Sequence, residues 1–153
     1  MVSHLTELLV ENGIEVTVID NLSSGSLKNL SSLLPDKIKF YKVDVLNKTS
    51  LEEIFKEGHF DAVVNLVGKG DLGSSVHNPL LYHDINVNGN LYLLYLTRRY
   101  DAKIFVFTSS GSFYKGDIVK PISEDDLLEP DSPYAASKLV SEIYCKTLIK
   151  YMA

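Results

Sequence analysis

Extended apolar runs alternate with helical patterns along the whole chain, and few folds accommodate this order. β-Branched and aromatic residues dominate four of the runs and predict strands at residues 14–20, 37–45, 61–68 and 103–110. Near-continuous apolar runs such as residues 62–67 are typical of strands that are buried on both faces. Strands separated by helices pair in parallel through right-handed crossovers. We therefore predict an α/β fold, a doubly wound parallel sheet with helices on both faces.

Helix start signals support this order. Thr49 and Glu52 fit a capping box at the start of one helix, and Ser132 followed by Pro133 is typical of an N-cap and first helical position. Gly13 predicts the end of an N-terminal helix. The predicted helices are residues 3–12, a helix from Thr49, residues 80–100, and a last helix from Ser132 onward.

Composition excludes several classes of protein. The 153 residues are 45% apolar and 23% charged, which is typical of one globular domain. The net charge of −5 is scattered, so a general nucleic-acid-binding role is disfavoured. The absence of a long apolar stretch or a signal peptide argues against a membrane protein and indicates a cytoplasmic one. The single cysteine, Cys145, and the four histidines lack the spacing of a metal site.

The strongest chemical signal is Tyr134-Ala135-Ala136-Ser137-Lys138, a Y-x-x-x-K pair at the start of the last helix. Residues four apart share a helix face. An ammonium about 4 Å from a phenol, at an effective dielectric of about 20, favours the phenolate by about 4 kcal/mol and lowers the phenol pKa toward neutrality. Tyr134 could then exchange a proton with a substrate hydroxyl, while Ser110, at the end of the preceding strand, bonds the same oxygen. An isolated Y-x-x-x-K pair also occurs as ordinary packing along an exposed helix. The catalytic interpretation therefore depends on the preceding strand, which ends at Ser110.

These residues resemble the extended short-chain dehydrogenase/reductases, specifically the NAD-dependent epimerase/dehydratase family. The resemblance implies a Rossmann-like domain, NAD as cofactor, a nucleotide-sugar substrate, and Ser110, Tyr134 and Lys138 as catalytic residues. Under it, Tyr134 removes a proton from a sugar hydroxyl as hydride passes to NAD. Members of this family commonly dimerise through the long helix and the tyrosine helix, so a homodimer is one option under the resemblance, and the oligomeric state stays open.

The same resemblance implies a set of cofactor-binding residues at the strand ends. An acidic residue after the second family strand accepts hydrogen bonds from the adenosine ribose and favours NAD over NADP, although an Asp-Asn pair also closes ordinary turns. The implied residues are Asp20, Asn21, Ser23, Ser24, Gly25, Asp44, Val45, Leu66, Val67, Gly68 and Asn86.

The sequence also departs from the family pattern. Gly111 and Ser112 stand where the 4,6-dehydratases have Asp-Glu, which disfavours dehydration. The chain begins two residues before Ser3-His4-Leu5 and has no G-x-x-G-x-x-G, the turn that holds the cofactor pyrophosphate. It ends in the tyrosine helix. We therefore expect a partial NAD-binding domain over residues 1–153, without the first strand and without a substrate domain, that binds NAD weakly or not at all and has little turnover.

In the family sheet the first strand lies between the second and the fourth. Without it, residues 14–20 and 61–68 would leave unpaired edges, pair with one another, or accept a strand from another chain. Three interpretations stay open: a fragment of a nucleotide-sugar epimerase with impaired cofactor binding, a non-catalytic fold remnant or assembly module, or another nucleotide-sugar reductase or decarboxylase of the superfamily.

Overall fold

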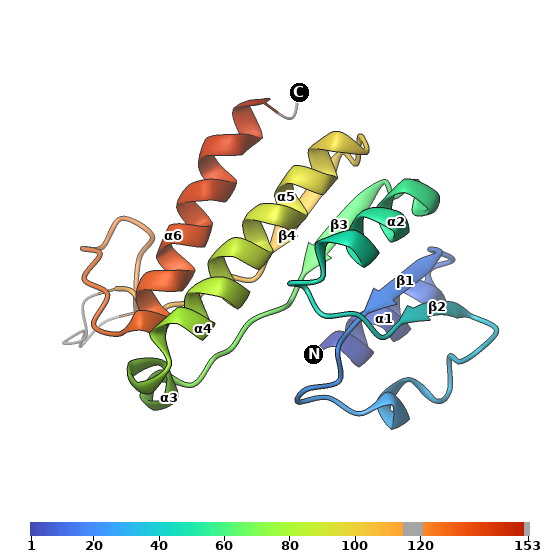
Figure 1. Ribbon diagram of the computed structural model, residues 1–153, viewed down its shortest axis with the longest axis horizontal. Helices are drawn as coiled ribbons and strands as arrows, with labels where there is room; N and C mark the ends of the chain where they lie inside the picture. Colours follow the sequence, from blue (N-terminus) through green and yellow to red (C-terminus); the bar gives the residue numbers. More distant parts are fainter. Residues whose placement is uncertain (115–120, 152–153) are drawn as a thin grey trace. The chain divides into compact units, whose positions relative to one another are not determined.

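The computed structural model describes residues 1–114 and 121–151, and it has the α/β organisation with parallel strands that the sequence predicts (Figure 1). The chain divides into two compact units, Met1–Leu51 and Glu52–Ala153. Each unit is built on one pair of parallel strands. That the whole chain is one partial NAD-binding domain remains a prediction.

The first unit has one helix, one short turn of helix and two strands. Its elements are α1 (Val2–Glu11), β1 (Val16–Ile19), the 3₁₀ turn η1 (Leu27–Leu30) and β2 (Ile38–Tyr41). The strands pair from Val16 opposite Ile38 to Ile19 opposite Tyr41. Inward-facing strand residues and the η1 region form a buried apolar cluster of Val18, Leu30, Leu33 and Ile38. The ends of β1 and β2, where predicted site residues lie, are therefore both supported by this small core.

The second unit holds most of the helices. Its elements are β3 (Ala62–Asn65), α3 (Leu72–His77), α4 (Pro79–His83), η2 (Asp84–Gly89), α5 (Asn90–Arg99), β4 (Ile104–Phe107), α6 (Pro133–Leu148) and η3 (Ile149–Tyr151), while α2 (Lys48–Gly58) spans the boundary between the units. β3 and β4 pair from Ala62 opposite Ile104 to Asn65 opposite Phe107. Figure 1 shows α4 and α5 running as one continuous helix beside α6, which contacts both.

The long helix differs from its prediction in its middle. Periodicity predicts one α-helix over residues 80–100, but the segment Asp84–Gly89 between α4 and α5 is π-helical. A π-helical segment carries one extra residue per turn, and such segments are frequent at functional sites. The buried side chain of Asn86 lies in this segment.

The predicted strands are all present, and each is shorter than its predicted range. The start of the last helix is also confirmed, because Ser132 Oγ accepts a hydrogen bond from Ala135 N at 3.1 Å. The capping box at Thr49 is wrong. α2 begins at Lys48, and Asn47 Oδ1 accepts from Ser50 N at 3.2 Å. The Glu52 carboxylate instead forms an ion pair with Arg99 at 2.7 Å.

The described strands form two separate two-stranded sheets, β1 with β2 and β3 with β4. One sheet lies in each unit, and which of the three predicted arrangements the segments 14–20 and 61–68 adopt stays a prediction. Each sheet retains strand edges without a strand partner among the described residues.

Candidate functional site

The predicted catalytic residues lie where the first turns of α6 meet the end of β4. The Ser132 cap and Pro133 fix where α6 begins. Tyr134 and Lys138 follow, one helical turn apart, on the same face of the helix. β4 ends at Phe107, and the residues directly after it meet this helix face.

Tyr134 and Ser110 approach each other from these two elements. The Tyr134 hydroxyl donates to Ser110 Oγ at 3.4 Å. Ser112 holds the same Ser110 oxygen, because its N–H donates at 3.2 Å and its hydroxyl lies 2.9 Å away. The buried ring of Tyr82 meets the Tyr134 ring edge-on, with 6.5 Å between the centroids. A bond of 3.4 Å is long, and one substrate oxygen could contact both hydroxyls.

Lys138 is buried in the same place, with 6% of its surface exposed. Its ammonium donates to the carbonyl oxygen of Thr108 at 2.6 Å and lies 4.5 Å from the centre of the Phe107 ring. Burial lowers the pKa of Lys138. The carbonyl and the ring face both favour the ammonium form. The observed hydrogen bond of Lys138 thus goes to the strand tip, by which we mean residues 108–110 directly after β4. The action of Lys138 on the Tyr134 phenol stays a prediction.

Glu142 is a third residue on this face of α6, and the sequence analysis missed it. Its Oε2 accepts a hydrogen bond from the Ser109 hydroxyl at 2.6 Å, and its Oε1 pairs with Lys146 at 2.6 Å. Burial alone would raise the pKa of Glu142, but the hydrogen bonds from Lys146 and Ser109 outweigh it, and the net shift is downward. The signal was available, since the spacing of four from Tyr134 to Lys138 continues to Glu142.

The loop after β3 passes close to Lys138. Asn65 Oδ1 accepts a hydrogen bond from Val67 N at 3.0 Å and so shapes the segment that contains Leu66. A Cβ on Gly68 would lie 3.3 Å from Asn86 Oδ1 and 3.5 Å from Lys138 Nζ. Glycine therefore lets the backbone at this predicted cofactor position approach both side chains.

Asn86 uses its side-chain amide within the protein. Its Oδ1 accepts from Lys69 N at 2.9 Å, and its Nδ2 donates to Lys69 O at 3.1 Å and to Ser137 Oγ at 2.8 Å. The amide therefore joins the loop after β3 to α6 between Tyr134 and Lys138. This geometry favours a structural role for Asn86, and its predicted contact with a cofactor stays a prediction.

The predicted adenosine-side residues gather at the ends of β1 and β2 in the first unit. Asn21 Nδ2 donates to Asp44 Oδ2 at 2.6 Å across the two strand ends. Asp20 Oδ1 accepts from Leu22 N at 2.6 Å, and Leu22 has a φ of +59°. Asp20, Asn21 and Asp44 therefore share one local cluster of carboxylate and amide groups.

The neighbouring residues differ in exposure. Ser23, Ser24 and Gly25 are exposed, and a Cβ on Gly25 would lie 3.9 Å from Asp20 Oδ2. Val45 is buried, so its side chain supports the strand end. The loop after β1 is thus accessible beside the Asp20 carboxylate.

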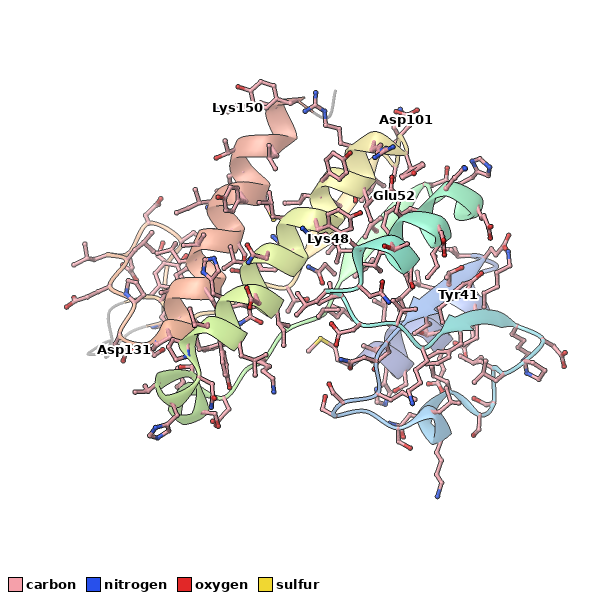
Figure 2. The ribbon with its side chains drawn as sticks, viewed as in Figure 1. Tyr41, Lys48, Glu52, Asp101, Asp131 and Lys150 are labelled. Atoms are coloured by element: carbon pink, nitrogen blue, oxygen red, sulfur yellow. The ribbon has the colours of Figure 1, made fainter. Side chains whose placement is uncertain are left out.

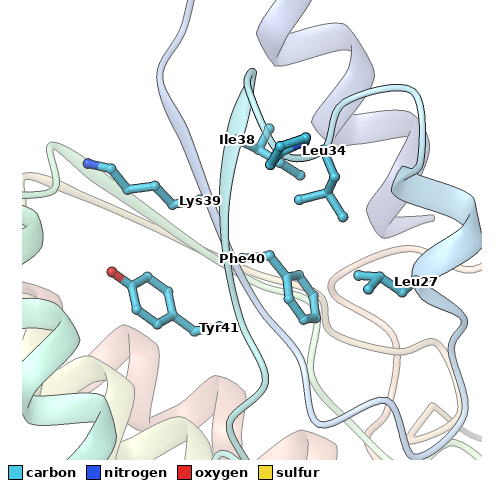
Figure 3. Close-up of a pocket in the computed structure, with 7 residues that line it drawn as sticks. Leu27, Leu34, Ile38, Lys39, Phe40 and Tyr41 are labelled. Atoms are coloured by element: carbon cyan, nitrogen blue, oxygen red, sulfur yellow. The ribbon is translucent and has the colours of Figure 1, made fainter.

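A separate pocket of about 630 Å³ lies in the first unit and contains none of the predicted site residues. Its lining residues are Leu27, Leu34, Pro35, Ile38, Lys39, Phe40 and Tyr41. Figure 3 shows the apolar side chains of Leu27, Leu34, Ile38 and Phe40 on one side of β2, with Lys39 and Tyr41 on the other. This alternation is the two-residue period of a strand.

A polar cluster on the second unit surrounds Glu52, which Figure 2 labels on α2. Its carboxylate pairs with Arg99 and accepts from the hydroxyls of Tyr92 and Tyr100 at 3.4 and 3.3 Å.

Within residues 1–114 and 121–151, no group of three or more His, Cys, Asp or Glu is placed to hold a metal ion. In the same residues no helix has both the length and the apolar character needed to cross a membrane.

The comparisons with known proteins agree on one family. A family model described as "NAD dependent epimerase/dehydratase family" matches residues 2–152. The chain is 36% identical to UDP-glucose 4-epimerase 2 of Oryza sativa subsp. japonica over 97% of its own length and 38% of that protein.

Solved structures give the same picture. The Thermus thermophilus UDP-glucose 4-epimerase in complex with NAD has a TM-score of 0.89 and 32% identity, over 98% of this chain and 48% of that one. The Thermotoga maritima UDP-glucose 4-epimerase with UDP-glucose has a TM-score of 0.88 and 33% identity, over 97% of this chain and 47% of that one. The chain thus spans less than half the length of these relatives.

Proposed function

Because the chain belongs to the NAD-dependent epimerase/dehydratase family, we propose that it carries an epimerase-type site for proton and hydride exchange at a hydroxyl of a nucleotide sugar. The observation that carries the proposal is the 3.4 Å approach of the Tyr134 hydroxyl to Ser110 Oγ, on the helix face that also carries buried Lys138. Relatives with UDP-sugar names support the substrate class.

The proposed roles rest on the positions of the three side chains. Tyr134 takes the proton of the sugar hydroxyl and later returns it. Ser110 donates a hydrogen bond to the same sugar oxygen and holds it beside the phenol. Lys138, buried on the same helix face and bonded to the Thr108 carbonyl, supplies the positive charge of the site.

The proposed cofactor is NAD, which when bound accepts a hydride from the sugar carbon and returns it. Several residues of the chain fit individual parts of NAD. Asp20, beside the exposed loop at Gly25, would accept hydrogen bonds from the ribose hydroxyls, and Asp44 with Val45 would flank the adenine. The lack of a side chain at Gly68 would let the loop after β3 pass close to the cofactor.

The sequence contains no G-x-x-G-x-x-G turn to bind the pyrophosphate. We therefore expect the 153-residue polypeptide to bind NAD weakly, with a Kd of about 1 mM. Isothermal titration calorimetry of the polypeptide with NAD measures this. Micromolar binding would contradict the expectation of weak affinity without contradicting the proposed chemistry.

The function is tested with several millimolar NAD and UDP-galactose or UDP-glucose. Because the chain is expected to turn over little, long incubations are used, and the wild-type chain is expected to form a small, measurable amount of the other epimer, detected by chromatography, with NADH absorbance as a second signal. Tyr134→Phe should lower this rate by about 100-fold or more while NAD affinity stays within about twofold. Tyr144→Phe, which changes an exposed tyrosine of the same helix, is the matched control and should retain activity.

The results also separate the competing interpretations. A wild-type rate no higher than that of Tyr134→Phe would overturn the proposal and favour a non-catalytic module. Lasting NADH formation from a nucleotide sugar without the second epimer would instead favour the reductase or decarboxylase branch. That branch uses the same three residues and differs in the fate of the keto sugar after the first hydride transfer.

A further inference from the structure

Three side chains spaced by four residues on α6 each bond one of three consecutive residues after β4. Tyr134 contacts the Ser110 hydroxyl, Lys138 bonds the Thr108 carbonyl, and Glu142 accepts from the Ser109 hydroxyl. We propose that Glu142 is a positioning residue that, through Ser109, holds the strand tip against α6 and so sets the distance between Ser110 and Tyr134. The catalytic part of this inference rests on the proposed function.

The lengths of the three bonds show where the tip is held. The bonds to Thr108 and Ser109 are 2.6 Å long, whereas the contact of Tyr134 with Ser110 is 3.4 Å. Ser110 cannot fix its own place on α6 with this long contact alone. Ser112 bonds the Ser110 hydroxyl from within the same loop, so the attachment of this loop to α6 depends on the two residues that precede Ser110.

The backbone offers this tip little support from the sheet. β4 ends at Phe107, and its ladder with β3 extends one step further, through Thr108 N bonded to Asn65 O at 3.2 Å. In an extended strand, successive side chains point to opposite faces. The hydroxyls of Ser109 and Ser110 both reach α6, so the chain has left strand geometry here. The position of the backbone at residues 108–110 therefore depends on hydrogen bonds that involve side chains.

Glu142 is well suited to hold a hydroxyl in place. Its carboxylate oxygens are divided between two partners, since Oε1 pairs with Lys146 and Oε2 accepts from Ser109. The side chain of Glu142 is 22% exposed, whereas that of Lys146 is 76% exposed. A hydroxyl bonded to a partly buried carboxylate is held more strongly than one bonded to a neutral group.

Amide hydrogen exchange, followed by NMR on the full chain, tests the positioning role without any activity. Ser112 N–H, which donates to Ser110 Oγ, is the reporter, and Thr108 N–H in the sheet ladder is the internal reference. Glu142→Ala should speed exchange at Ser112 by about tenfold relative to Thr108. Glu142→Gln, which keeps an acceptor oxygen, should restore most of the protection.

Two further variants complete the design. Ser109→Ala removes the same bond from the strand side, so the test does not depend on one α6 variant folding. Combined with Glu142→Ala it should add no further exchange, because both changes remove one interaction. Lys146→Ala removes only the exposed ion pair and should leave Ser112 exchange near the wild-type value. Unchanged exchange at Ser112 in Glu142→Ala, or an equal increase at Thr108, would overturn the proposal.

The catalytic consequence is measured separately. Glu142→Ala should lower kcat about tenfold while the KM values for NAD and the nucleotide sugar stay within about twofold, and Glu142→Gln should recover most of kcat. A loss confined to KM, or no rescue by Gln, would overturn the link to Ser110. If the wild-type chain shows no turnover, the proposed function fails, whereas the exchange measurement still decides the role of Glu142.

Discussion

The two clusters of predicted site residues are held in different ways. At the ends of β1 and β2, Asp20, Asn21 and Asp44 accept bonds from backbone N–H groups two residues further along the chain, and one bond crosses between the strand ends. Between α6 and the strand tip, the bonds of Lys138 and Glu142 join residues 30 and 33 positions apart.

This difference matches what each cluster would have to do. Local turns leave side-chain groups near solvent, where they can bind a ligand and adapt to it. Long-range bonds between buried groups fix relative positions, which proton exchange between two hydroxyls requires. The comparison fits the roles proposed above, with ligand binding at the first cluster and proton exchange at the second.

The largest expected effect comes from removing one asparagine in each cluster. Asn86→Ala removes a buried amide and its three hydrogen bonds, of which the one to Ser137 Oγ is buried and the two to Lys69 are part-buried, and should lower the free energy of unfolding by about 3 kcal/mol. Asn21→Ala removes a partly exposed bond to Asp44 and should cost about 1 kcal/mol or less. Urea unfolding followed by circular dichroism measures both. Equal losses would show that the two clusters are held alike.

Much of the second cluster could be predicted from the sequence because it depends on short-range patterns. The spacing of Tyr134 and Lys138 defines a helix face, and the Ser132-Pro133 start fixes where that helix begins. Residues that end a β-branched run lie at a strand tip, which is why Ser110 was found. These signals need only a few neighbouring residues.

The missed features depend on residues that are far apart in the sequence. The bond between Glu142 and Ser109 spans 33 positions, and periodicity gives a helix face without naming its partner. The π-helical segment at Asn86 inserts one residue into a regular pattern, which a helical periodicity of about 3.6 residues cannot locate. The cap at Asn47 was missed because Thr49 and Glu52 fit the local pattern equally well.

The next effect concerns cofactor choice at the first cluster. Asp20→Asn removes the negative charge beside the exposed loop and should weaken NAD binding by about tenfold, while binding of NADP, whose 2′-phosphate the carboxylate repels, should weaken less or improve. Calorimetric titration of wild type and variant with both dinucleotides gives the ratio. Tyr134→Phe is the control and should leave the ratio unchanged. An unchanged ratio in Asp20→Asn would remove Asp20 from the proposed ribose contact.

A smaller effect is expected from the pH dependence of stability at the second cluster. The folded pKa of Glu142 lies below the ordinary value of 4.5, because its bonds to Lys146 and Ser109 outweigh the effect of burial. The stabilisation that this carboxylate provides is therefore complete above pH 4.5 and is lost as the pH falls through the folded value.

Glu142→Gln removes this titration. The difference in unfolding free energy between wild type and variant should be constant from about pH 6 to 8 and should shrink progressively below about pH 4.5. Urea unfolding at a series of pH values measures the difference. A difference that grows as the pH falls would have the wrong sign and would contradict the pairing of Glu142 with Ser109 and Lys146.

The smallest effect is expected from an ion pair on the first unit. Lys39 and Glu15 lie 3.0 Å apart, but their side chains are 63% and 81% exposed. Water and salt screen such a pair, so Lys39→Ala should leave the thermal unfolding midpoint unchanged within error. Lys103→Ala, which removes the exposed pair with Asp101 in the second unit, is the matched control and should behave in the same way. If only Lys39→Ala lowered the midpoint, surface charge would stabilise the first unit but not the second. The difference between the two clusters would then be electrostatic as well as a difference in hydrogen bonding.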